Sequence, residues 1–230
     1  MQDYRGAVRP DPSEPRLDVR VRRPRPRAIV LLLHGGQQTS QEPVRDRHAS
    51  WWRMAMLARA LRRTARRERW EVRLLQNAVR GWNDPRDPSP VRAARWALER
   101  LAHEAPGTPV VLVGHSMGGR TACRVADDDA VLGVVGLAPW LPQGEPATAL
   151  RGKALRVLHG TADRWTSSAA SRSFVDRCRA VGVDATWTAL PDAGHFMFRR
   201  VGTWNAFVED SVLDLVGPSD HAPTRDPEIP

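Results

Sequence analysis

The sequence predicts an α/β fold, a doubly wound and mostly parallel sheet of about six to seven strands with helices on both faces. Short apolar runs alternate along the chain with longer amphipathic stretches, which is the order that builds such a sheet. Most of the apolar runs are continuous, as is typical of strands that helices cover on both sides. A chain of 230 residues, 41% of them hydrophobic, is long and apolar enough to bury this sheet in one domain.

Seven segments are predicted to be strands. Six are β-rich apolar runs, at 28–33, 72–76, 110–113, 131–137, 154–158 and 185–190. The seventh, at 17–21, alternates apolar and polar residues, and this pattern indicates an additional strand at an edge of the sheet.

The segments between the strands are predicted to be helices, at 50–67, 89–105, 167–180 and 204–215, with a further helix just after the run at 110–113. The first of them places its apolar residues on one stripe, opposite an arginine-rich face. In the second, Ser89 is expected to cap the N-terminus and Pro90 to take the first helical position, where a missing N–H is tolerated.

The two ends of the chain are expected to be flexible tails. Residues 1–15 contain three prolines and few apolar groups, and residues 217–230 are similar in composition. No internal repeat and no linker interrupts the chain between them. One domain is therefore predicted over residues 16–216.

The composition argues against several classes of partner. No run approaches the roughly 18 apolar residues of a membrane-spanning helix, and the first residues lack the apolar core of a signal peptide. A cytoplasmic protein without a membrane partner is therefore expected. The net charge is +9, and Lys153 is the single lysine among 35 basic residues. The arginines are scattered among acidic residues, and the run at 20–27 has no interleaved aromatics, so no nucleic-acid partner is expected.

The segment 110–119 carries the clearest chemical signal. It reads as a strand, then Gly114-His115-Ser116-Met117-Gly118, then a helix. A sharp turn between strand and helix leaves a serine hydroxyl exposed to a base, and glycines before and after it avoid collisions with the neighbouring strand and helix. The N–H of Met117, at the start of the helix, would point to where an oxyanion develops.

This segment resembles the nucleophile elbow of the α/β-hydrolases. The resemblance implies an α/β-hydrolase fold and a serine esterase in which Ser116 is the nucleophile. Only thirteen residues, 141–153, separate two predicted strands where many members of the family carry a cap domain. The short segment is similar to the dienelactone-hydrolase-like branch with a small cap, although dienelactone hydrolases use a cysteine where this chain has Ser116.

The resemblance also places a second oxyanion donor after the pair His34-Gly35. The donor would be the N–H of Gly36, with Gln37 as the alternative. His34 itself is expected to support the loop rather than take part in the chemistry.

The remaining two members of a catalytic triad are expected in loops after later strands. Asp163 follows the strand at 154–158, in the kind of loop where the family carries the acid that orients the base. Glu145 and Asp192 are its rivals. His195, in the segment Ala193-Gly194-His195, has the setting that the family uses for its base.

The short cap implies an open site for small or flexible substrates. Trp82, Trp140 and Trp165 are predicted just beyond strand ends, where they would line an apolar pocket or, equally, pack beneath loops. No metal-ligand pattern and no dinucleotide- or phosphate-binding glycine motif is present, so neither a metal nor a cofactor is expected.

The sequence therefore predicts a serine hydrolase that cleaves carboxylic esters through an acyl-enzyme. A thioesterase that acts on acyl-CoA or on acyl groups of a carrier protein is the alternative, because acidic carriers dock on basic surfaces. A third possibility is a protein that has the hydrolase fold but binds a ligand without catalysing a reaction.

Overall fold

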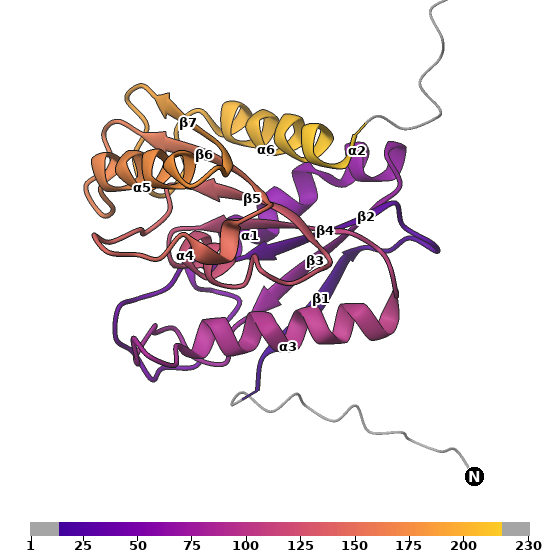
Figure 1. Cartoon of the computed structure of the whole chain (residues 1–230). Helices are drawn as coiled ribbons and strands as arrows, with labels where there is room; N and C mark the ends of the chain where they lie inside the picture. The colour runs from indigo at the N-terminus through magenta and orange to yellow at the C-terminus, as the bar shows by residue number, and fades with distance from the viewer. Residues whose placement is uncertain (1–13, 218–230) are drawn as a thin grey trace, which may run out of the picture.

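The computed structural model describes residues 14–217 and is built around a seven-stranded sheet (Figure 1). The order across the sheet is β1-β3-β2-β4-β5-β6-β7, and only the edge strand β1 runs antiparallel to its neighbour. The strands are β1 (Arg16–Val21), β2 (Ala28–Leu33), β3 (Trp70–Gln76), β4 (Val110–His115), β5 (Val131–Leu137), β6 (Ala154–Gly160) and β7 (Asp184–Leu190). The predicted fold class and the predicted edge strand are both confirmed.

Six helices cover the two faces of the sheet (Figure 1). One face packs against α1 (Ala49–Ala60), α2 (Arg62–Arg67) and α6 (Val201–Val216), and the other against α3 (Ser89–Glu104), α4 (Met117–Arg124) and α5 (Ser168–Ala180). Strand β4 contributes to both cores, since Val111 and Val113 belong to the first and Val110 and Leu112 to the second. Because successive strand residues face opposite layers, an apolar run without polar interruptions is what this position requires.

Two local predictions are corrected by the structure. The helix predicted over 50–67 is interrupted at Leu61, which separates α1 from α2 and is itself fully buried. Leu61 and Ala65 both face the core on the side of β3, so the apolar stripe continues across the break. In the second case, Pro88 rather than Ser89 is the N-cap of α3, and the Ser89 hydroxyl instead donates to the carbonyl oxygen of Gly81, 3.0 Å away.

The connection between β5 and β6 is short, as the sequence predicted. It contains only one 3₁₀ turn, η1 (Thr148–Leu150), so no large cap covers the carboxyl ends of the strands. The elements run from Arg16 to Val216. The tails predicted at 1–15 and 217–230 fall almost entirely outside the described residues. In the described part of the chain, no helix has the length and apolar character to cross a membrane.

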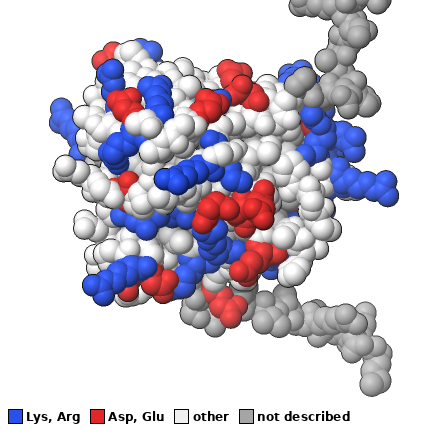
Figure 2. Space-filling view, in the orientation of Figure 1, with Lys and Arg blue, Asp and Glu red and all other residues white. Residues whose placement is uncertain are grey.

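Basic and acidic side chains are intermixed on the surface. Figure 2 shows blue and red groups intermixed over most of the face in view, with several blue groups together at its right edge. Many arginines pair with neighbouring acids, as Arg156 does with Asp184 and Asp214. Most of the basic side chains in view therefore lie among acidic ones, and some gather at one edge.

Candidate active site

Ser116 lies at a sharp turn between β4 and α4. Its backbone has φ 55° and ψ −118°, a strained conformation for a residue with a side chain. A Cβ atom at Gly114 would collide with the carbonyl oxygen of Gly118, and one at Gly118 with that of Leu33. The glycines therefore allow the turn to pass between the neighbouring strand and helix, as the sequence analysis predicted.

The structure brings Ser116, His195 and Asp163 together from three separate segments. Nε2 of His195 lies 3.0 Å from Oγ of Ser116, and Nδ1 of His195 lies 2.8 Å from Oδ2 of Asp163. Ser116 and His195 are each 7% exposed, so the hydroxyl and the imidazole are largely shielded from water but reachable. A base within hydrogen-bond distance of a hydroxyl, oriented by a carboxylate, is the arrangement that activates a serine.

The carboxylate of Asp163 is tightly held by its own loop. Oδ1 accepts hydrogen bonds from the backbone N–H groups of Trp165, at 2.7 Å, and Thr166, at 2.9 Å. Oδ2 accepts one from the Thr166 hydroxyl at 3.0 Å. Burial by itself would raise the pKa of Asp163, but hydrogen bonds from His159, His195 and Thr166 hold it well below its usual value. The group facing His195 is therefore an anion.

The two other candidate acids, Glu145 and Asp192, have different partners. Both carboxylate oxygens of Glu145 are paired, one with Arg120 and the other with Arg124. Asp192 is exposed, and only its backbone N–H, which donates to the Thr161 hydroxyl, is engaged. Neither carboxylate contacts His195 in the described structure.

Gly36 and Met117 both line the cleft beside Ser116. Met117 begins α4, so its N–H has no partner within the helix. The N–H of Gly36 donates to no protein group among residues 14–217, whereas that of Gln37 donates to the carbonyl oxygen of Arg80 at 2.8 Å. Of the two candidates after His34-Gly35, Gly36 is thus the one whose amide is available.

Two further histidines support the site, and sequence reasoning found a role for only one of them. Nε2 of His34 accepts a hydrogen bond from the backbone N–H of Asn77, and Nδ1 lies 2.6 Å from the Gly35 carbonyl oxygen. His34 therefore stabilises the loop that carries Gly36. His115 donates from Nε2 to the carbonyl oxygen of His195 at 2.9 Å. Burial lowers the pKa of His34 to about 4, and burial together with the nearby His195 lowers that of His115 to about 3. Both rings are therefore neutral supports.

The cleft has two lobes that meet at Ser116. One, of about 220 Å³, is lined by the start of α1 together with Arg80 and Phe196. The other, of about 300 Å³, is lined by Met117, Trp140 and Thr166. The rings of Trp165 and His195 border both lobes.

The three tryptophans singled out from the sequence therefore differ. Trp165 is 73% exposed and Trp140 lines one lobe. Trp82 is 2% exposed and is not brought to the cleft. Its ring packs instead against the guanidinium of Arg120, with 4.0 Å from the guanidinium carbon to the ring centroid.

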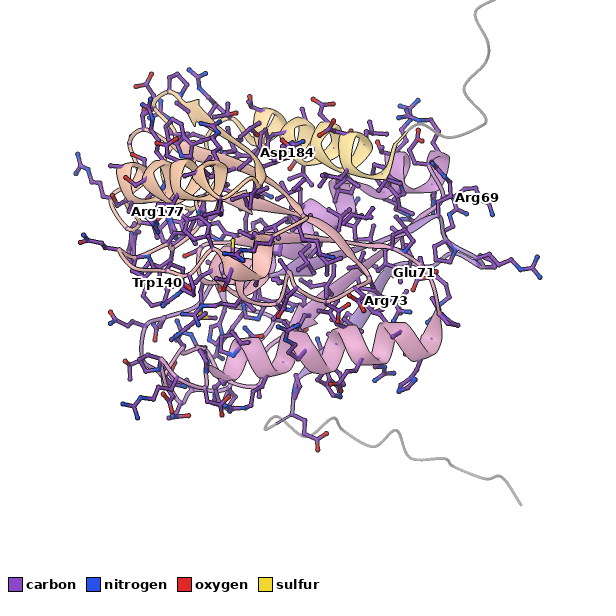
Figure 3. All side chains as sticks on the ribbon, viewed as in Figure 1. Arg69, Glu71, Arg73, Trp140, Arg177 and Asp184 are labelled. Carbon is purple, nitrogen blue, oxygen red and sulfur yellow. The ribbon has the colours of Figure 1, made fainter. Side chains whose placement is uncertain are left out.

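A larger hollow, of about 820 Å³, lies at the opposite end of the sheet. Arg22, Glu71 and Arg73 line it, and β3 begins here. Figure 3 shows Glu71 and Arg73 far from Trp140, which marks the catalytic end. Parallel sheets of this kind bind ligands at the carboxyl ends of their strands, so the smaller cleft at Ser116 is the candidate active site. Within residues 14–217, no three His, Cys, Asp or Glu side chains gather in the way a metal ion would require.

The sequence from residue 30 to residue 230 matches the model of the alpha/beta hydrolase family. The chain therefore belongs to this family of enzymes, as its elbow predicted, and the elbow position holds a serine. Among curated proteins, none matches the chain.

Several solved structures have the same fold as this chain over most of both chains. A serine hydrolase without a lid from Xanthomonas campestris has a TM-score of 0.67 and 18% identity, over 89% of this chain and 90% of that one. An alpha-beta serine hydrolase homologue from Coxiella burnetii has a TM-score of 0.66 and 16% identity, over 86% and 91%. An esterase from Pyrococcus furiosus has a TM-score of 0.61 and 15% identity, over 84% of each. The lidless neighbour agrees with the small cap.

Proposed function

We propose that the protein is a serine hydrolase that cleaves carboxylic esters through an acyl-enzyme intermediate. The observation that carries the proposal is the placement of His195 between Ser116 Oγ and an ionised Asp163. The esterase among the structural neighbours is consistent with it.

In the first half of the reaction, Ser116 Oγ attacks the carbonyl carbon of the ester while its proton passes to Nε2 of His195. The carbonyl oxygen becomes an oxyanion, to which the amides of Gly36 and Met117 donate in this proposal. Asp163 stabilises the imidazolium that forms. The C–O bond to the alcohol then breaks, and the leaving oxygen takes the proton from Nε2.

The second half repeats the same steps with water. Water replaces the alcohol beside His195 and loses a proton to Nε2 as its oxygen attacks the acyl carbon. Collapse of the second oxyanion breaks the bond to Ser116 Oγ, which regains its proton. The products are the free acid and the regenerated serine.

The cleft supports small or flexible substrates with an apolar group. Its two lobes are at or below the lower limit of about 300 Å³ for sites that hold drug-sized ligands. Beside His195, the ring of Trp165 lies 5.3 Å from that of Phe196, which lies 6.0 Å from that of Phe198. These partly exposed rings offer an apolar surface to an acyl or alcohol group, and we expect a small-molecule partner rather than a nucleic acid or a membrane.

A fluorophosphonate probe tests the nucleophile directly. The wild-type protein should be labelled covalently and Ser116→Ala should not be, because the probe requires an activated serine. Equal labelling of both proteins would overturn the assignment.

Substrate preference is best measured with a graded panel. Rates on 4-nitrophenyl esters of increasing chain length, compared with rates on acyl-CoA thioesters, separate an esterase from the thioesterase alternative. The small lobes predict the highest kcat/KM on short acyl chains. A protein that takes up these compounds tightly without turnover would instead be a binding module.

A further inference from the structure

A second histidine, His159, contacts the carboxylate of Asp163, and the proposed reaction assigns it no role. His159 is the penultimate residue of β6 and is completely buried. Its Nε2 lies 3.3 Å from Oδ2 of Asp163, and also 3.3 Å from the Thr166 hydroxyl that donates to the same oxygen. His195 and His159 thus approach one carboxylate oxygen from two sides.

On the side of the ring away from Asp163, two more side chains hold Nδ1 of His159 in place. The indole N–H of Trp187 can only donate, and Ser171 Oγ accepts it at 2.9 Å. Ser171 Oγ in turn lies 2.8 Å from Nδ1 of His159. Because an ionised carboxylate can only accept, His159 must present Nε2–H to Asp163. Its Nδ1 is held by Ser171 Oγ, whose hydroxyl donates to the carbonyl oxygen of Ser168 at 2.9 Å.

This row of donors links three elements of the fold to the acid. Trp187 belongs to β7, Ser171 to α5 and His159 to β6. Ser171, like His159, has no exposed surface, so water cannot replace either partner. The side chain of Asp163 is itself fully buried, and without His159 its Oδ2 would keep only Thr166 and His195 as partners.

We propose that His159, held by Ser171 and Trp187, is a positioning residue that fixes Asp163 Oδ2 in the direction of His195. The inference rests on the proposed ester hydrolysis, since it assigns the residue to that site. A carboxylate that can turn away from Nδ1 no longer fixes the imidazole toward Ser116, and catalysis is sensitive to displacements of this kind. Substrate contacts are untouched, so the effect belongs to kcat rather than to KM.

The experiment compares two substitutions of one residue. His159→Leu removes the donor, whereas His159→Gln keeps an amide N–H near the former position of Nε2. With 4-nitrophenyl acetate as the substrate, kcat of His159→Leu should fall by about 10- to 100-fold while KM stays within about threefold. His159→Gln should restore most of the loss. Melting temperatures of all variants are measured alongside.

Ser171→Ala keeps the test valid if His159→Leu does not fold. It leaves the imidazole in place but removes the partner that orients Nδ1, and kcat should fall by about 3- to 10-fold. Ser211→Ala is the matched control, because it removes a buried hydroxyl from α6 that has no bond to this row of side chains. It should keep the wild-type kcat.

The outcomes separate the two levels of the proposal. If the wild-type protein is labelled by fluorophosphonate and hydrolyses the ester, but folded His159→Leu or Ser171→Ala is equally active, the role of His159 is wrong and the hydrolase stands. A Gln variant as slow as the Leu variant would also contradict a role that depends on the donated hydrogen bond. A wild-type protein that is neither labelled nor active would overturn the proposed function, and this inference with it.

Discussion

At the scale of the residue, adding a Cβ atom at Gly36 should have a large effect on catalysis. A Cβ there would collide with the carbonyl oxygen of Arg80 and with the side chain of Met117, so the loop would have to shift. The shift would move the Gly36 amide away from the oxyanion. We expect Gly36→Ala to lower kcat by about 100-fold, the usual effect of losing one oxyanion donor.

The matched control for this substitution is Gly202→Ala. Gly202 lies in α6, and a Cβ there would meet nothing within 4 Å. Activity on a 4-nitrophenyl ester should be unchanged or nearly so in this variant, which is also a mild helix stabiliser. Wild-type kcat in folded Gly36→Ala would remove Gly36 from the oxyanion site.

The sequence revealed the residues whose neighbours along the chain are distinctive. Ser116, Asp163 and His195 each stand in a short motif after an apolar run, and order along the chain related them. His115 could not be found in this way. Its role depends on the hydrogen bond to the carbonyl oxygen of His195, which lies 80 residues further along the chain, and no local pattern records such a contact.

At the scale of the element, Arg120 joins α4 to the loops on either side of it. Its guanidinium lies over both Trp82 and Trp140, 4.0 and 4.4 Å from the ring centroids, and pairs with Glu145 at 2.7 Å. Arg177, labelled with Trp140 in Figure 3, donates to the carbonyl oxygen of Glu145 at 3.3 Å. The helix that begins at the elbow is thereby anchored at its outer side.

Replacing this arginine should cost more than replacing its neighbour. Arg120→Met leaves the buried Glu145 with one partner fewer and the two rings without a cation, so the free energy of unfolding should fall by about 2 to 3 kcal/mol. Arg124→Met is the matched control, because Arg124 pairs with the same carboxylate but is 28% exposed; it should cost about 1 kcal/mol or less. Urea unfolding measures both, and equal losses would contradict the anchoring role.

Elements were predictable wherever burial sets their pattern. The strands needed only apolar runs, and the edge strand needed only alternation, because the covering layers impose these patterns. The break at Leu61 left no such signal, since the apolar stripe continues through it into α2. The start of α3 was missed for a related reason. Ser89 is a good capping residue, but the carbonyl oxygen of Gly81 is close enough to take its hydroxyl.

At the scale of the whole molecule, the order of strands in the sheet is what the sequence could not supply. Strand β2 lies between β3 and β4, and β1 crosses to the far side of β3. Parallel sheets are consistent with several such orders, and the choice depends on how the helices pack together on each face. The carboxyl ends of β2, β4, β6 and β7 lie at one end of the sheet because these strands are parallel, and their order sets how far apart the site residues lie across it.

The fold as a whole should lose stability below neutral pH through its two buried neutral histidines. The pKa of His34 falls from about 6.5 to about 4 on folding, and that of His115 to about 3, because burial disfavours the charged ring. Below pH 6.5 the unfolded chain takes up protons that the folded protein excludes. The free energy of unfolding therefore decreases as the pH falls, by about 1.4 kcal/mol per pH unit for each ring. The lowered pKa of Asp163 acts in a lower range, because its contribution is lost only below the ordinary pKa near 3.8.

Urea unfolding at pH 6.5 and pH 5 measures this effect. Because each ring is already half protonated in the unfolded chain at pH 6.5, the two rings together should lower the free energy of unfolding by about 3 kcal/mol between these pH values. His34→Gln, which replaces one titrating ring by an amide, should show about half of that dependence. Free energies that do not change between the two pH values would mean that these rings accept protons in the folded state, and the support they give to the loops at Gly36 and His195 would then have to work in the charged form.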